Sequence, residues 1–257
     1  MNAVHRVLDP RAGVQVPPDL CALGVMTKAP RAGQVKTRLT PPLTSEEAAA
    51  LNICFLRDTA AAISAVAAEG RAAGIAVYTP RGAEAAWAEI LPGHFEMIPQ
   101  RGDGFGERLH LACEDLLRVG FASICLIDSD SPTVPERAYG RAVELLSQPG
   151  DRVVLGPSDD GGYYLIGLKT AHQPLFEQID WSTESVAEQT IERSGEIGLS
   201  VELLPKWYDV DDGATLRRLC AELLEPPDAS SGYAAPETHG FLAGVIAREG
   251  RDRIWPR

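Results

Sequence analysis

The residues most suited to binding a charged ligand begin with a basic loop in an otherwise acidic chain. Lys28, Arg31, Lys36 and Arg38 lie within eleven positions, and Gly33 between them lets the backbone bend closely around a ligand. Such cations and backbone N–H groups can hold a di- or triphosphate. The loop is neither a Walker A loop nor a dinucleotide fingerprint, because both glycine patterns are missing. It predicts phosphate binding, and a solvated basic loop is the alternative.

A pair of carboxylates follows the most apolar stretch of the chain, SICLID. Asp128 and Asp130 lie two positions apart, so both side chains point to the same side of an extended strand. Two hard oxygen ligands suit Mg²⁺ or Mn²⁺, which can bridge to phosphate oxygens. Ser129 and Pro132 also fit a tight turn, so a turn capped by an aspartate is the alternative.

The segment GPSDDGGYYLIGL, residues 156–168, places acids, glycines and tyrosines directly before an apolar strand. Gly161 and Gly162 allow close approach of the backbone to a ligand. Asp159 or Asp160 can accept hydrogen bonds from hydroxyl groups or bind a second cation, and Tyr163 and Tyr164 can line a sugar or a base. A plain β-turn explains the same residues equally well.

Two further segments carry groups of this kind. In WYDVDDGATL, Asp212 fits the N-cap of the helix that follows, while Asp209 and Asp211 exceed what capping needs and suggest a late metal ligand. In QRGDGFGERL, alternating glycines around Gly104 precede Arg108, which predicts a loop that contacts an anionic ligand.

The elements that must position these residues alternate between strands and helices. Apolar segments predict strands at 20–26, 75–78, 96–98, 123–128, 152–155, 163–168 and 200–204. Helices are expected from Thr44 to the glycines at 70 and 74, and at 105–118, 135–147, 183–193, 213–224 and 239–248. Thr44 and Glu47 fit a capping box. This alternation predicts a mostly parallel sheet covered on both faces, with ligands at the carboxyl ends of the strands.

Composition narrows the class of protein. The 257 residues carry 24 Lys+Arg against 36 Asp+Glu, a formal net charge of −12, with 45% hydrophobic residues. These proportions exclude a disordered chain and argue against nucleic-acid binding. Five scattered cysteines without a C-x-x-C pair indicate buried, reduced thiols in a cytoplasmic protein. No targeting segment is recognised, and the longest apolar runs, about five residues, are too short to span a membrane.

The chain is expected to form one main domain with two appendages. Residues 1–19 read as a flexible N-terminal arm and residues 20–225 as the ligand-binding domain. Residues 226–257 read as a linker rich in Pro, Ser and Ala followed by a C-terminal helical extension.

The motifs together resemble a known family. KAPRAGQVKTRL, GDGFGERL, DSDSP, GPSDDGGYYLIGL, the W-S-T at Trp181 and DVD follow the order of the radical-SAM/selenodomain-associated transferase 1 family. That family, formerly a domain of unknown function, belongs to the GT-A-type nucleotide-diphospho-sugar transferase superfamily. The resemblance spans residues 20–225, and the basic loop with its helix also resembles 2-phospholactate guanylyltransferases and, more distantly, molybdenum-cofactor guanylyltransferases. Where the family usually has Gly, this chain has Asp128, so Asp130 is the matching metal-site acid. Asp128 is then an extra ligand or a residue that shapes the turn.

The resemblance implies a fold and a set of site residues. The fold is an α/β, GT-A-type Rossmann-like three-layer sandwich with a mostly parallel central sheet, which binds a nucleotide through a divalent metal. The metal ligands are expected to be Asp128, Asp130 and Asp211, and the catalytic residues Asp130 and Asp160. Nucleotide and phosphate contacts are expected from Lys28, Gly33, Lys36, Arg38, Gly104 and Arg108. Substrate contacts are expected from Gly161, Gly162, Tyr163 and Trp181.

Glycosyl and nucleotidyl transfer both develop negative charge on a phosphate leaving group, which a metal and nearby cations stabilise. The sequence therefore predicts a transferase, dependent on Mg²⁺ or Mn²⁺, that moves a glycosyl group from a nucleotide sugar to a small acceptor. A nucleotidyltransferase joining an NTP to a phosphorylated small molecule is the first alternative, and the Lys36–Arg38 pair favours it. A non-catalytic nucleotide-binding protein is the second. The expected partners are the nucleotide and the acceptor, and a homodimer stays open.

Overall fold

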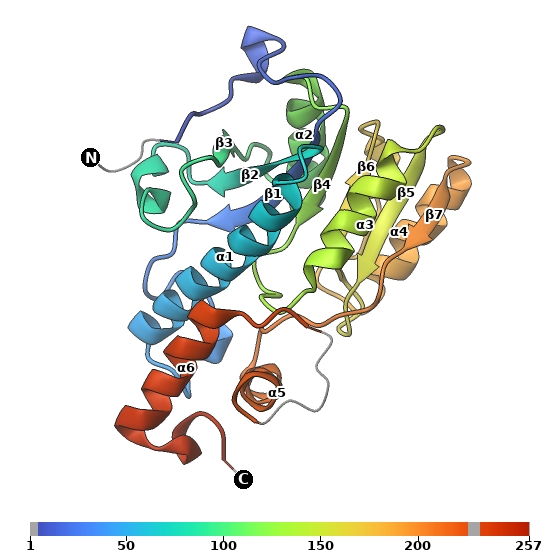
Figure 1. Ribbon diagram of the computed structural model, residues 1–257. Helices are drawn as coiled ribbons and strands as arrows, with labels where there is room; N and C mark the ends of the chain where they lie inside the picture. Colours follow the sequence, from blue (N-terminus) through green and yellow to red (C-terminus); the bar gives the residue numbers. More distant parts are fainter. Residues whose placement is uncertain (1–4, 226–231, 257) are drawn as a thin grey trace.

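The computed structural model describes residues 5–225 and 232–256, which fold around a seven-stranded sheet of order β3-β2-β1-β4-β6-β5-β7 (Figure 1). The strands are β1 Cys21–Lys28, β2 Ala72–Thr79, β3 Glu96–Pro99, β4 Ser123–Ile127, β5 Arg152–Pro157, β6 Tyr163–Leu168 and β7 Ser200–Leu203. β6 runs antiparallel to β4 and β5, and the other paired strands are parallel. The expected α/β fold with a mostly parallel sheet is confirmed.

Helices cover both faces of the sheet. The helices are α1 Ser45–Ala67, α2 Phe105–Arg118, α3 Glu136–Ser147, α4 Val186–Glu196, α5 Gly213–Leu224 and α6 Pro236–Glu249. α1 and α3 lie in front of the sheet in Figure 1 and share one apolar core with it, whereas α2 lies behind. All five residues of β4 are buried, as expected for a central strand covered on both faces. The three layers are therefore helix, sheet and helix.

α1 shows how a short sequence motif determines where a helix begins. The Thr44 hydroxyl accepts from the Glu47 N–H at 3.2 Å, and the Glu47 carboxylate accepts from the Thr44 N–H at 2.9 Å. The expected capping box is confirmed. Among the described residues, α1 is the helix long and apolar enough to cross a membrane, but 61% of its apolar window is buried inside the fold. That burial is what a core helix requires.

Three expected helices have different bounds. α1 ends at Ala67, and Gly74, which was expected to end it, lies within β2. α4 begins at Val186 rather than at residue 183, because the Thr183 hydroxyl donates to the Asp180 carbonyl at 2.7 Å and forms a turn there. α6 begins at Pro236 rather than at residue 239, with the proline in the first turn. Proline is favoured there because its missing N–H has no partner in a first turn.

The antiparallel direction of β6 brings the sequence motifs to one edge of the sheet. Because β6 runs against its neighbours, the turn that precedes it lies at the same edge as the carboxyl ends of β1 and β4. The segment after β7 joins them, since the Val210 N–H donates to the Asp130 carbonyl at 2.9 Å. Ser158 also forms an isolated bridge with Trp207. Segments from four regions of the chain thus converge at one edge.

Both ends of the described chain pack on this domain. The Leu8 N–H donates to the Met97 carbonyl at 2.8 Å, which lays residues 5–8 along β3, and the Gln15 N–H donates to the Val119 carbonyl at 2.7 Å. At the other end, α6 begins on α1, where the buried Asp58 carboxylate accepts from the Thr238 N–H at 2.8 Å. Residues 226–231 of the expected linker lie outside the described residues.

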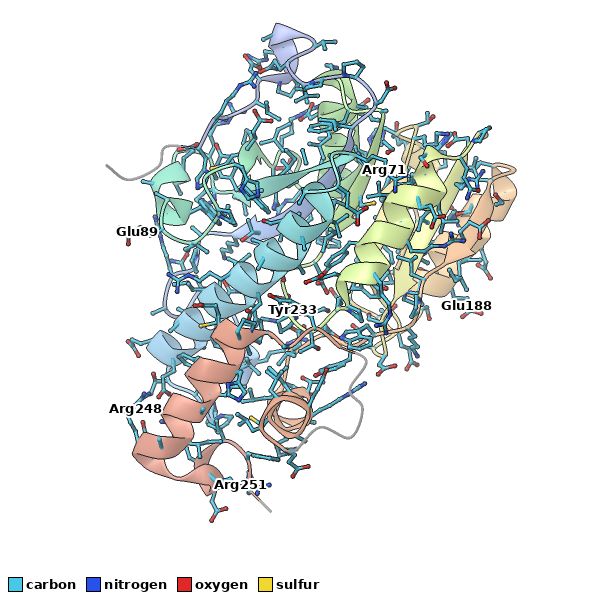
Figure 2. All side chains as sticks on the ribbon, in the orientation of Figure 1. Arg71, Glu89, Glu188, Tyr233, Arg248 and Arg251 are labelled. Atoms are coloured by element: carbon cyan, nitrogen blue, oxygen red, sulfur yellow. The ribbon has the colours of Figure 1, made fainter. Side chains whose placement is uncertain are left out.

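The C-terminal helices also support the basic loop. Leu39, within the short helix Thr37–Leu39, packs in one buried cluster with Phe55 of α1, Leu216 of α5 and Leu242 of α6. The Tyr233 N–H donates to the Thr133 carbonyl at 2.9 Å, and Figure 2 shows this side chain on the segment that leads into α6. The extension is therefore part of the packing beneath the predicted ligand loop.

Candidate active site

Three adjoining cavities meet at Asp130, which lines all of them, with volumes of about 570, 270 and 150 Å³. Together they form what we call the Asp130 cleft. Arg38 and Asp211 line both larger cavities, while Phe105 lines the largest and the smallest. The cleft lies beyond the carboxyl ends of β1 and β4, where open α/β sheets bind their ligands.

The centre of the cleft holds a buried ammonium group. Lys36 Nζ lies 2.8 Å from Asp130 Oδ1 and 2.9 Å from Asp211 Oδ1, and it donates to the Val210 carbonyl at 2.7 Å. Its side chain is only 4% exposed. Burial alone would lower the pKa of Lys36, but the two carboxylates outweigh it and raise the pKa above its usual value. Lys36 is therefore charged at neutral pH.

Two of the three acids expected to hold a metal, Asp130 and Asp211, are thus brought to one cation position. Hard carboxylate oxygens at such a position are ligands that Mg²⁺ and Mn²⁺ accept, so these side chains fit a divalent cation. Within residues 5–225 and 232–256, no group of three His, Cys, Asp or Glu side chains converges as a ready ligand set. The protein would have to complete the coordination shell with ligand phosphates and water, as is usual for Mg²⁺.

Asp128 lies beside this position but is engaged in a turn. Its carboxylate accepts from the Ser131 hydroxyl at 2.8 Å and from the Asp130 N–H at 3.3 Å. Burial, followed by the charge of Asp130, raises the pKa of Asp128 well above its usual value. The side chain holds the bend that aims Asp130 into the cleft.

The remaining basic-loop residues occupy different positions. Lys28 and Arg38 line the 270 Å³ cavity beside Asp130. Lys28 Nζ donates to the Gln34 carbonyl at 3.3 Å, which closes the loop on itself. Gly33 has a φ of 71°, in the left-handed region that glycine adopts without strain. Arg38 is exposed at the cleft, so its guanidinium is available to a ligand.

The turn before β6 forms one wall. Asp160 Oδ1 accepts from the Gly162 N–H at 2.9 Å and from the Ser158 hydroxyl, and all three residues line the largest cavity. Gly161 has a φ of 89°, and a Cβ there would lie 1.9 Å from the Glu184 carbonyl oxygen. Gly161 is therefore required by the close approach of the chain before α4.

An aromatic pair closes the far side of the cleft. The rings of Phe105 and Trp181 lie 5.0 Å apart, edge to face, and both line the largest cavity. Phe105 is 52% exposed despite its size. Tyr163 lines the same space, and burial raises the pKa of its hydroxyl. Sequence reasoning assigned roles to Trp181 and Tyr163 but missed Phe105, whose signal was a lone aromatic residue among alternating glycines.

The wall that includes the turn before β6 carries negative charge. Asp160, Glu184, Asp209 and Asp211 all line the largest cavity. Burial, then the charges of Asp160 and Asp211, raises the pKa of Asp209 to about 6. Glu184 was also missed from the sequence, although it directly follows the W-S-T motif.

Among the residues expected to contact the ligand, Gly104 and Arg108 have structural partners instead of a place in the lining of the cleft. Gly104 is the N-cap residue of α2, and Arg108 donates to the Gly102 and Asp103 carbonyls at 3.2 and 3.3 Å. Asp212 caps α5 as expected, accepting from the Ala214 and Thr215 N–H groups at 2.8 Å each. Gly104 and Arg108 thereby fix the loop that presents Phe105.

Comparisons with known proteins show what the chain resembles. Residues 62–183 match the family model described as "Uncharacterized protein conserved in bacteria (DUF2064)". The chain is 28% identical to a protein of known structure from Desulfovibrio desulfuricans G20, described as a candidate nucleotide-diphospho-sugar transferase. The match covers 91% of this chain and 99% of that chain, with a TM-score of 0.76. No protein of curated function matches.

Two further solved structures match with TM-scores below 0.5. Rv0371c from Mycobacterium tuberculosis H37Rv is 18% identical over 79% of this chain and 98% of that chain, with a TM-score of 0.48. Glucosyl-3-phosphoglycerate synthase from Mycobacterium tuberculosis is 12% identical over 94% and 82%, with a TM-score of 0.47. The resemblance to the GT-A-type nucleotide-diphospho-sugar transferase superfamily, and the Rossmann-like sandwich it implied, are confirmed.

Proposed function

We propose that this protein is a metal-dependent transferase that moves a glycosyl group from a nucleotide sugar to a small acceptor. The observation that carries the proposal is the convergence of Asp130 and Asp211 on one cation position, next to a basic loop. The likeness to a candidate nucleotide-diphospho-sugar transferase, with a TM-score of 0.76, supports it.

Asp130 and Asp211 would hold Mg²⁺ or Mn²⁺. When bound, the ion supplies positive charge to the diphosphate leaving group, whose negative charge grows as the glycosidic bond breaks. Asp128 holds the turn that orients Asp130. Lys28 and Arg38 would bind the phosphate oxygens, whereas the Lys36 ammonium is already paired with Asp130 and Asp211.

The opposite wall defines the acceptor. Asp160, Glu184 and Asp209 repel a phosphorylated molecule, whereas their oxygens accept hydrogen bonds from sugar hydroxyls. Phe105 and Trp181 offer apolar ring surface on which a sugar can pack. An uncharged, hydroxyl-bearing acceptor fits this wall best.

The negative charge of that wall also favours glycosyl transfer over nucleotidyl transfer. A nucleotidyltransferase that consumes a phosphorylated substrate must place a second anion in the cleft, against four carboxylates of its largest cavity. The Lys36–Arg38 pair was the argument for that alternative, but Lys36 already neutralises Asp130 and Asp211. Less free positive charge remains for a triphosphate, so glycosyl transfer is favoured.

A product assay separates the possibilities. The protein is incubated with nucleotide sugars or NTPs, each with a panel of neutral and phosphorylated acceptors and with Mg²⁺ or Mn²⁺. Release of NDP from a nucleotide sugar supports our proposal, and release of pyrophosphate from an NTP supports nucleotidyl transfer. Tight nucleotide binding without turnover across the panel would indicate a binding protein. The matched control is Asp130→Ala, which should lower any true turnover by about 100-fold or more.

We also assign the protein to the cytoplasm. All five cysteines are free and buried within the described structure, which suits a reducing compartment. Fractionation of producing cells tests this assignment, and recovery in the periplasmic or extracellular fraction would contradict it.

A further inference from the structure

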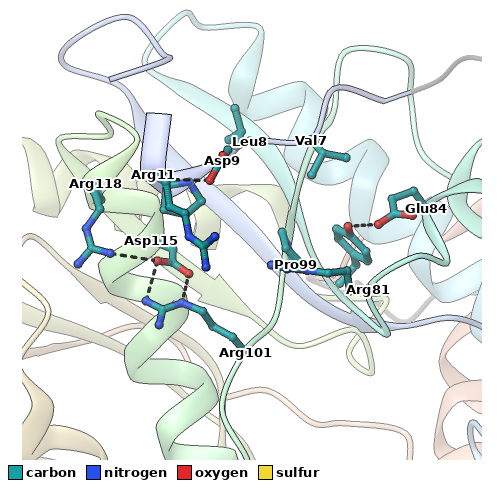
Figure 3. A pocket seen from close by; sticks show the side chains of 12 residues that line it. Val7, Leu8, Asp9, Arg11, Arg81, Glu84, Pro99, Arg101, Asp115 and Arg118 are labelled. Atoms are coloured by element: carbon teal, nitrogen blue, oxygen red, sulfur yellow. Dashed lines mark hydrogen bonds and ion pairs between the residues drawn. The ribbon is translucent and has the colours of Figure 1, made fainter. Parts of the chain in front are cut away.

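A separate cavity of about 400 Å³ lies between residues 7–11, the ends of β2 and β3, and the last turn of α2 (Figure 3). It shares no lining residue with the three cavities of the Asp130 cleft. Four of its lining residues are arginines: Arg11, Arg81, Arg101 and Arg118. In a chain with a net charge of −12, four cations around one cavity need a physical explanation.

Two of these arginines are fixed by one buried acid. Arg101 donates to Asp115 through Nε at 2.6 Å and through Nη2 at 2.8 Å, the two-point geometry typical of arginine and carboxylate. Arg118 Nη1 lies 3.7 Å from the same carboxylate. The Asp115 side chain is 4% exposed, so this acid anchors both guanidinium groups at the cavity wall.

The other two arginines have no such partner. Within the described residues, neither Arg11 nor Arg81 forms an ion pair, and Figure 3 shows their side chains extending toward the same space. Asp9 and Glu84 line the same cavity and keep their negative charge, but neither forms an ion pair with Arg11 or Arg81 among the described residues. Asp9 accepts from the backbone N–H of Arg11 at 2.9 Å, and Glu84 accepts from the Gly82 N–H at 2.9 Å and from the Tyr78 hydroxyl. Two guanidinium groups therefore remain available to a ligand.

We propose that this arginine cavity binds the phosphate group of a small phosphorylated molecule. Guanidinium groups match the tetrahedral oxygens of phosphate and bind them in pairs, so Arg11 and Arg81 would grip the anion directly. Arg101 and Arg118, which are paired with Asp115 and Glu114, form the adjoining wall. A volume of 400 Å³ exceeds what a single phosphate needs, and Leu8, Pro99 and the Tyr78 ring line the remainder. An organic portion of the ligand would lie against these surfaces.

Calorimetric titration of the full chain with inorganic phosphate and with glycerol 3-phosphate tests the proposal. The wild type should bind both probes without a divalent cation, and glycerol 3-phosphate more tightly if the apolar lining contributes. Equal affinity would identify the anion alone as the ligand. The double variant Arg11→Gln/Arg81→Gln should raise the Kd at least tenfold. Arg137→Gln, an exposed arginine of α3 away from the cavity, is the matched control and should bind as the wild type does.

The basic loop of the Asp130 cleft can also attract phosphate, so a second variant separates the two regions. The double variant Lys28→Gln/Arg38→Gln should still bind phosphate in the arginine cavity. Arg11→Gln/Arg81→Gln should lose that binding. The inference is overturned if Arg11→Gln/Arg81→Gln, shown to be folded by its unchanged melting temperature, binds as the wild type does. It is equally overturned if Lys28→Gln/Arg38→Gln removes all phosphate binding, because the signal would then belong to the cleft.

Discussion

The two walls of the Asp130 cleft stand on one edge of one sheet and carry opposite charge. The basic loop after β1 presents Lys28 and Arg38, whereas the turn before β6 and the segment after β7 present Asp160 and Asp209. Lys36 crosses between the walls, because it belongs to the basic loop but bonds Asp130 and Asp211. The first wall suits phosphates, and the second suits hydroxyl groups.

The difference teaches how one cleft can hold two ligands of unlike charge. A nucleotide diphosphate placed against the acidic wall would be repelled, and a neutral acceptor placed against the basic loop would gain little. The carboxylates that face Lys36 stand at the boundary, where a leaving phosphate would separate from the transferred group. Each prediction below tests one side of this division, or the boundary itself.

The largest effect is expected at the boundary. Asp130→Ala should lower kcat by about 100-fold or more, about 2.7 kcal/mol, the scale of losing one principal electrostatic stabiliser. It removes a proposed metal ligand and one of the two carboxylates that hold Lys36. Steady-state kinetics at several Mn²⁺ concentrations measure the loss.

Asp159→Ala is the matched control for that variant. Asp159 belongs to the same turn as Asp160, but it pairs with Arg218 at 2.6 Å and does not line the cleft. It should retain nearly normal turnover, since exposed ion pairs contribute little. A normal rate for Asp130→Ala, or activity independent of any divalent cation, would refute the role given to Asp130.

The next effect separates the two glycines of the acidic wall. Gly161→Ala should lose about 2 kcal/mol or more of unfolding free energy, because its left-handed φ and the Glu184 carbonyl both oppose a Cβ. Gly162→Ala meets only the side chains of Asp160 and Ser158, at 3.2 and 3.3 Å. It should remain folded and lose kcat/KM for the acceptor. Urea unfolding combined with kinetics on folded protein distinguishes the two results.

This comparison separates a structural glycine from a ligand-facing one. Equal stability of Gly161→Ala and the wild type would contradict the backbone contact, and unchanged kinetics of Gly162→Ala would place the acceptor elsewhere. The sequence suggested that either glycine lies against a ligand. In the structure, the nearby Glu184 carbonyl explains why position 161 needs glycine, and no ligand is involved.

A smaller effect concerns the basic wall. Arg38→Ala should weaken nucleotide affinity about tenfold, the loss of one charge-assisted contact, and leave the melting temperature unchanged because Arg38 is exposed. Lys36→Ala should lower both the nucleotide affinity and the melting temperature, because its buried ammonium bridges two carboxylates that would otherwise repel each other. Nucleotide titration and thermal melts of both variants provide the test, and identical behaviour of the two would undo the distinction.

Much of the fold follows from local sequence, because each signal acts over a few residues. The Thr44–Glu47 capping box, the buried run of β4 and the N-cap at Asp212 are all read within a single turn or strand. The placement of site loops after strands follows from the general rule for parallel sheets.

The pairings across the cleft were beyond sequence reasoning. Lys36 and Asp211 lie 175 positions apart, and their contact depends on the register of the whole sheet. A lysine in a basic loop predicts phosphate contact, yet burial and two carboxylates give it another partner. The arginine cavity could not be predicted from the sequence for the same reason. Arg11, Arg81 and Arg118 are distant in sequence, and each resembles a solvated surface charge.

The smallest expected effect is a pH dependence that reports the charge of the acidic wall. Burial and the neighbouring carboxylates raise the pKa of Asp209 from an ordinary 3.8 to about 6. Between those values the folded state keeps a proton that the unfolded state has lost, so this group's contribution to stability falls as pH rises through the window. Asp209→Asn carries no such charge. The unfolding free energy of Asp209→Asn, measured relative to that of the wild type, should therefore increase from pH 4 to pH 7. The increase should be less than about 1 kcal/mol because water screens this partly exposed group. Urea unfolding of both proteins without divalent cations measures the difference, and a flat difference across the window would mean that the wall carries less charge than its four acids suggest.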